Sequence, residues 1–203
     1  MCAWLLALFC LFSTAPSPDL AIYLSADPSQ PAAPVEHMKR ELSAMMQAAG
    51  YRVVWGDPRS PDRIGHANLV VLELRGPCGL PPGNYGIERS VESGASLAAT
   101  SVSPGGVLPF SWVNCANLTR MLAPVLAGEP LAQRDYLYGR AMARVAAHEL
   151  YHAVTGSRDH GREGVAKPRF SVSDLLDESF DFDQTARANL RQRAADTEPP
   201  VGR

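Results

Sequence analysis

The segment from Leu131 to Thr155 carries the longest helical pattern of the chain, and Gly156 is placed to end it. Apolar side chains recur on more than one face of this segment, so we expect a largely buried helix. His148 and His152 are four residues apart and therefore lie one turn apart on the same face. An unpaired polar group is costly inside a protein, so both imidazoles need partners there.

A zinc ion is a suitable partner for both histidines. The residues HELYH, from 148 to 152, have the HExxH spacing, in which two imidazoles bind one zinc ion. Glu149 would then stand beside the ion without binding it and take a proton from a zinc-bound water. The alternative is a core helix that holds no metal, with its histidines bonded to backbone or carboxylate groups.

A catalytic zinc ion takes three protein ligands and keeps a fourth position open. His160 is the first candidate for the third ligand, because Gly156 allows the chain to turn back below the helix. Glu178, on or just after a downstream helix, is the rival ligand. Asp159 and Glu163 are weaker candidates, and we expect both to be solvated.

Composition limits the remaining classes of function. The chain has 203 residues, a hydrophobic share of 46% and a formal net charge of −2, which suit one globular domain, predicted here for residues 20–195. The sequence has no block of basic residues, so we do not expect a nucleic-acid partner. It gives no indication of the oligomeric state. We expect residues 196–203 to form a disordered tail.

The first fifteen residues resemble a signal peptide. The apolar run at 4–12 is too short to span a bilayer, and small residues at 13–15 offer a cleavage site. We therefore predict that residues 1–15 are removed, that the protein is secreted or periplasmic, and that it has no stable membrane anchor.

Two cysteines would remain after removal of the signal peptide. Cys2 and Cys10 would leave with it, whereas Cys78 and Cys115 would stay. In an exported domain two cysteines favour a disulfide, and two buried free thiols are the alternative.

Hydrophobic periodicity and turn residues predict the other elements. Pro109 places the second strand of an expected hairpin at a sheet edge or a bulge. Asn114 or Asn117 is expected to cap the helix that ends at Leu126. The expected strands are 20–25, 51–55, 68–74, 95–102 and 107–113, and the expected further helices are 35–49, 173–177 and 183–195.

The segment HELYHAVTGSRDH resembles the zinc-binding motif of metzincin-type metalloproteases. The usual pattern is HExxHxxGxxH, and this chain has one extra residue on each side of the glycine. The resulting HExxHxxxGxxxH is most similar to a group of bacterial, predicted secreted proteases. The positions that match this group are His148, Glu149, His152, Gly156, His160 and Gly164.

The resemblance implies a zincin-like α+β fold, with a mixed β-sheet packed on a long active-site helix and a helical C-terminal part. It also implies a zinc-dependent endopeptidase with one catalytic Zn²⁺ on His148, His152 and His160, and with Glu149 activating the water. The peptide or protein substrate would lie along an edge strand, for which 95–102 is a candidate.

The chain departs from the group's pattern beyond the third histidine. The group has Gly-Ile-Met where this chain has Gly164, Val165 and Ala166. Ala166 would leave a smaller hydrophobic floor beneath the metal than methionine does. The alternative function is therefore a catalytically weak or inactive zincin-like zinc-binding domain, with a structural or partner-binding role.

Overall fold

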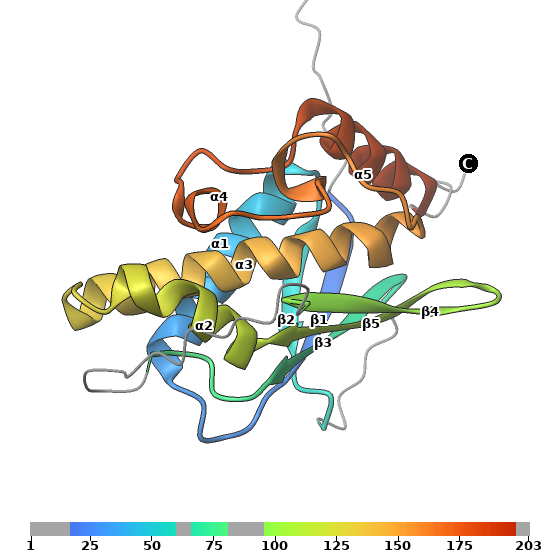
Figure 1. Cartoon of the computed structure of the whole chain (residues 1–203). Helices are drawn as coiled ribbons and strands as arrows, with labels where there is room; N and C mark the ends of the chain where they lie inside the picture. The colour runs from blue at the N-terminus through green and yellow to red at the C-terminus, as the bar shows by residue number, and fades with distance from the viewer. Residues whose placement is uncertain (1–16, 60–65, 81–95, 198–203) are drawn as a thin grey trace, which may run out of the picture.

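The computed structural model describes residues 17–59, 66–80 and 96–197, which form a five-stranded sheet with helices packed on it (Figure 1). The strand order is β2-β1-β3-β5-β4. Neighbouring strands are parallel except at the pair of β4 and β5. The expected mixed sheet is thus confirmed, and it is mostly parallel. The proposed signal peptide at 1–15 lies outside the described residues.

The chain opens with a β-α-β unit and a third strand. The elements are β1 (Asp19–Ser25), α1 (Ala32–Ala48), β2 (Arg52–Gly56) and β3 (Asn68–Arg75). The expected order is confirmed, but the expected start of α1 at residue 35 is wrong. The helix begins three residues earlier, because Pro31 is the N-cap and Pro34 lies in the first turn, where the missing N–H is not needed.

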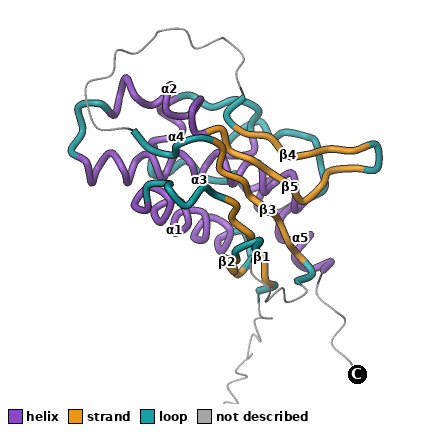
Figure 2. Tube along the Cα trace, turned by 90° about the horizontal axis from the view of Figure 1, so that it is seen from below, coloured by secondary structure: helices purple, strands orange, loops and turns teal. Residues whose placement is uncertain are grey.

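The expected hairpin is formed by β4 (Ala98–Ser103) and β5 (Gly106–Asn114). It projects beyond the rest of the sheet (Figure 2). Pro109 faces the point where the pairing register shifts, between Thr100 and Val102, so the predicted bulge is confirmed. Among the described residues β4 pairs with β5 alone, which makes β4 an edge strand.

The long helix α3 (Leu131–Thr155) is the centre of the packing. It contacts β3, β4 and β5 on one side and every other helix of the described chain on the others. Its residues from Tyr138 to His152 are all buried, as its apolar faces predict. Helix α2 (Cys115–Leu126) begins at Asn114, whose side chain accepts from the Asn117 N–H, so Asn114 is the cap. None of the described helices is long and apolar enough to cross a membrane.

The C-terminal part is helical, as expected. It contains a 3₁₀ turn (Gly164–Ala166), α4 (Val172–Leu176) and α5 (Gln184–Thr197). The predicted start of the disordered tail at residue 196 is wrong, because Asp196 and Thr197 belong to α5. The Thr197 hydroxyl donates to the carbonyls of Arg193 and Ala194 in the last turn of this helix. Residues 198–203 lie outside the described part of the chain.

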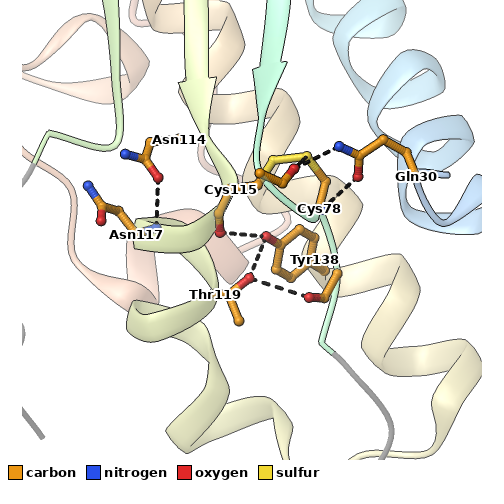
Figure 3. Close-up of a disulfide and its surroundings, with 9 residues drawn as sticks. Gln30, Cys78, Asn114, Cys115, Asn117, Thr119 and Tyr138 are labelled. Atoms are coloured by element: carbon orange, nitrogen blue, oxygen red, sulfur yellow. Dashed lines mark hydrogen bonds between the residues drawn. A yellow bond between two sulfur atoms is a disulfide. The ribbon is translucent and has the colours of Figure 1, made fainter. Parts of the chain in front are cut away.

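Cys78 and Cys115 form a disulfide, which joins the segment after β3 to the start of α2 (Figure 3). The Cys78 N–H donates to the side chain of Gln30 at 2.8 Å. The Tyr138 hydroxyl of α3 donates to the Cys115 carbonyl at 3.0 Å. The disulfide therefore links the sheet, α2 and α3 at the end of the sheet where β3 and β5 finish.

We expect the double variant Cys78→Ala, Cys115→Ala to lose about 3–4 kcal/mol of unfolding free energy, because a bond across 37 residues restricts the unfolded chain. Urea denaturation with and without reductant measures this. Reductant should destabilise the wild type and leave the double variant unchanged. Equal denaturation midpoints for the oxidised wild type and the double variant would contradict the expectation.

Candidate metal centre

Three histidines converge at the C-terminal end of α3. His148 and His152 come from the helix, and His160 comes from the loop that follows it. One nitrogen from each ring lies within 4.8 Å of the others. The chain can return because Gly156 adopts a left-handed conformation (φ 68°), in which its N–H still donates to the His152 carbonyl.

The two helix histidines are each fixed by a backbone carbonyl. The Nδ1 atom of His148 lies 2.8 Å from the Val165 carbonyl, and that of His152 lies 2.8 Å from the Ser157 carbonyl. A carbonyl only accepts, so each Nδ1 must carry the proton. Burial lowers the pKa of His148 to about 4 and also lowers that of His152. Both rings are therefore neutral at pH 7, with an unprotonated Nε2.

The two Nε2 atoms face each other at 3.2 Å. Neither carries a proton that the other could accept, so two lone pairs point at one space. A cation between them resolves this, and Zn–N bonds of about 2.0–2.1 Å suit ligands at such a separation. The donor set and its orientation thus fit a zinc ion held by His148, His152 and His160.

The carbonyl that orients His148 belongs to a tightly held turn. The Val165 N–H donates to the Asp181 carbonyl at 3.1 Å, and the Gly161 N–H donates to the Ala166 carbonyl at 2.8 Å. Gly164 has φ 60°, and a Cβ there would lie 2.4 Å from the Asp181 carbonyl oxygen. Only glycine fits this position, which gives a physical reason for the match at Gly164 noted in the sequence.

Glu149 is buried beside the histidines, and a side chain of the edge strand β4 bonds its carboxylate. The Thr100 hydroxyl lies 2.7 Å from the Glu149 carboxylate, and the Ser111 hydroxyl lies 3.0 Å from that of Thr100. Burial raises the pKa of Glu149 to about 7, although the bond from Thr100 lowers it. Glu149 is therefore a carboxyl poised to exchange a proton near neutral pH.

The rival ligand Glu178 lies elsewhere. Its carboxylate is exposed and pairs with Arg140 at 3.1 Å. Arg140 precedes His148 by eight residues on α3, a distance of about 12 Å along the helix. Asp159 and Glu163 are exposed, as expected, and neither belongs to the cluster of three histidines.

Two buried tyrosines of α3 have hydroxyl groups that are engaged with other parts of the protein. Tyr138 is buried near the disulfide, where its hydroxyl bonds Thr119 and the Cys115 carbonyl. The Tyr151 hydroxyl accepts from the Asn189 side chain of α5. Arg158 does border the site, and its guanidinium donates to the Ser103 carbonyl at 2.8 Å.

The histidines and Glu149 line a cleft of about 980 Å³ that runs along β4. Its other walls come from α2 and from the loop after α3. Phe170, between the 3₁₀ turn and α4, packs edge-to-face on His148 with ring centroids 5.3 Å apart. An aromatic side chain thus supports the first histidine in a chain that lacks the methionine of the Gly-Ile-Met pattern. Neither Phe170 nor Thr100 stands in a sequence pattern that could have revealed its role.

Comparisons with known proteins give a structural relation only. No family model matches the chain, and no curated protein matches it in sequence. Its fold is similar to that of the crystal structure of archaemetzincin from Methanopyrus kandleri, with a TM-score of 0.51 and 15% sequence identity. The similarity covers 87% of this chain and 96% of the archaemetzincin chain. The chain therefore shares the archaemetzincin fold.

We expect the purified protein to bind one zinc ion per chain, and His160→Ala to weaken binding by more than about a hundredfold, because an open site with two ligands remains. Glu178→Ala is the matched control and should keep full affinity, since Glu178 pairs with Arg140. Isothermal titration of chelator-treated protein measures both. Full binding by His160→Ala together with loss in Glu178→Ala would contradict the assignment.

Proposed function

We propose that this protein is a zinc-dependent endopeptidase. The observation that carries the proposal is the pair of neutral imidazoles with facing Nε2 atoms, next to His160 and a buried carboxyl, in a cleft beside an edge strand. The archaemetzincin fold supports it at the level of architecture. His148, His152 and His160 would hold the ion.

When bound, the ion would supply a Lewis acid that polarises the scissile carbonyl and makes water a stronger nucleophile. Glu149 would accept the proton that the attacking water loses as its oxygen bonds to the carbonyl carbon. The same carboxyl would return a proton to the nitrogen as the C–N bond breaks. The Thr100 hydroxyl, 2.7 Å from this carboxylate, would hold it in place for both proton transfers.

The edge strand would hold the substrate. The backbone of β4 is paired on one side by β5, and its other side borders the cleft. An extended peptide can add to such an edge through main-chain hydrogen bonds. Thr100 belongs to this strand and bonds Glu149, so the strand that would align the peptide also positions the carboxyl.

We also propose that the protein is exported, to the cell exterior or the periplasm. The disulfide between Cys78 and Cys115 supports this, because disulfides persist in oxidising compartments. The apolar N-terminal segment supports it independently.

The test is cleavage of a peptide mixture by zinc-loaded protein, followed by mass spectrometry. We expect the wild type to cut internal bonds and Glu149→Gln to lower kcat by about a hundredfold or more, because the amide cannot accept the proton. Zinc content and melting temperature of the variant should match the wild type. A zinc-loaded wild type that leaves every peptide intact would contradict the proposal and favour the inactive zinc-binding domain.

The same assay tests Thr100 as a positioning residue. Thr100→Val keeps the shape of the side chain but removes the hydroxyl that bonds Glu149, so kcat should fall roughly tenfold. Thr100→Ser restores the hydroxyl and should recover most of the rate. Equal rates for the Val and Ser variants would show that the hydroxyl does not position Glu149.

A further inference from the structure

We propose that the cleft selects peptides with acidic side chains on both sides of the scissile bond. This inference rests on the proposed peptidase function and names its substrate class. The evidence is the charge of the cleft wall, which differs from the charge of the chain as a whole. The chain has a net charge of −2, whereas the described cleft residues include three arginines and one acidic residue, Glu149.

The three arginines are Arg120, Arg158 and Arg169, and all are exposed to solvent. None of them forms an ion pair within the part of the chain that the structure describes. By contrast, Arg140 and Arg144, which are buried on α3, both form ion pairs with Glu41. The charge of the cleft arginines is therefore left for a ligand.

Neutral groups hold two of these guanidinium groups at opposite ends of β4. Arg158 donates to the Ser103 carbonyl at the hairpin end of the strand. Arg120 donates to the side chain of Asn117, which in turn donates to the Ser96 carbonyl at 2.8 Å. Both arginines are thus positioned without losing their charge.

The spacing of these contacts fixes which substrate residues they can meet. Thr100 bonds Glu149 and so marks the reacting position along the strand. At about 3.3 Å per residue, Ser103 lies about 10 Å from Thr100 and Ser96 about 13 Å from it on the other side. An extended peptide would therefore place residues about three or four positions from the scissile bond next to each arginine.

Apolar side chains also line the cleft between the arginines, beside the histidines and Glu149. Leu97, Ala99 and Val107 line it along the hairpin, and Phe170 lines it on the opposite wall, next to Arg169. Small or apolar substrate side chains fit beside the scissile bond, and acidic side chains fit further out. Because the arginines are exposed, each should add only about threefold to affinity at low ionic strength.

The experiment uses the zinc-loaded, full-length Glu149→Gln protein and three fluorescein-labelled peptides of ten residues. The peptides share an Ala-Gly centre and carry Glu, Gln or Lys at the outer positions. Fluorescence anisotropy should show the Glu peptide binding about tenfold more tightly than the Gln peptide, with the difference shrinking as salt is added. Arg120→Gln and Arg158→Gln, added to this background, should each weaken the Glu peptide about threefold and leave the Gln peptide unchanged.

Arg191→Gln is the matched control, because Arg191 also donates to a carbonyl, that of Ala48, but lies outside the cleft. This variant should leave the affinity for all three peptides unchanged.

Equal affinity for the Glu and Gln peptides, tighter binding of the Lys peptide, or no binding of any peptide would overturn the inference. Cleavage of the Gln or Lys peptide by the wild-type protein would then leave the peptidase proposal standing. Tighter binding of the Glu peptide than of the Gln peptide, with no cleavage by the wild-type protein, would support the acidic preference of the cleft. The same result would contradict the peptidase proposal.

Discussion

The site depends on two hydrogen bonds from histidine side chains to backbone carbonyls. The carbonyls of Val165 and Ser157 each take the Nδ1 proton of one ring, so both Nε2 lone pairs point into the same space. The arrangement is costly without a cation and favourable with one. Burial strengthens this preference, because it lowers the pKa of both imidazoles and keeps protons from taking the place of the ion.

The turn that holds the Val165 carbonyl is itself bonded to the C-terminal part of the chain. Arg144, buried on α3, donates to three carbonyls within residues 175–180 and pairs with Glu41. The next carbonyl along the chain, that of Asp181, accepts from the Val165 N–H. Helix α3 thus carries His148 and His152, and it also carries Arg144, whose guanidinium fixes the segment next to Asp181. We infer that residues 175–181 orient His148 through the Val165 turn as well as cover the core.

Local sequence patterns predict most of the elements, because strand and helix periodicity and cap residues act over a few positions. His148 and His152 could be predicted for the same reason, since both lie on one face of one helix. The bond from Thr100 to Glu149 could not, because it spans 49 residues between a strand and a helix. The contact of Phe170 with His148 depends likewise on the path of a long loop. The ends of the helices were predicted less well than the helices themselves, since α1 begins earlier and α5 ends later than expected.

Zinc K-edge X-ray absorption of the loaded protein tests the central claim most directly, because it counts the imidazoles around the ion. The account predicts three imidazole nitrogens at about 2.0–2.1 Å and one oxygen ligand. His160→Ala should reduce the imidazole count to two. A wild-type spectrum with two imidazoles, a sulfur ligand or a six-oxygen shell would contradict the three-histidine site that the geometry of α3 and its following loop indicates.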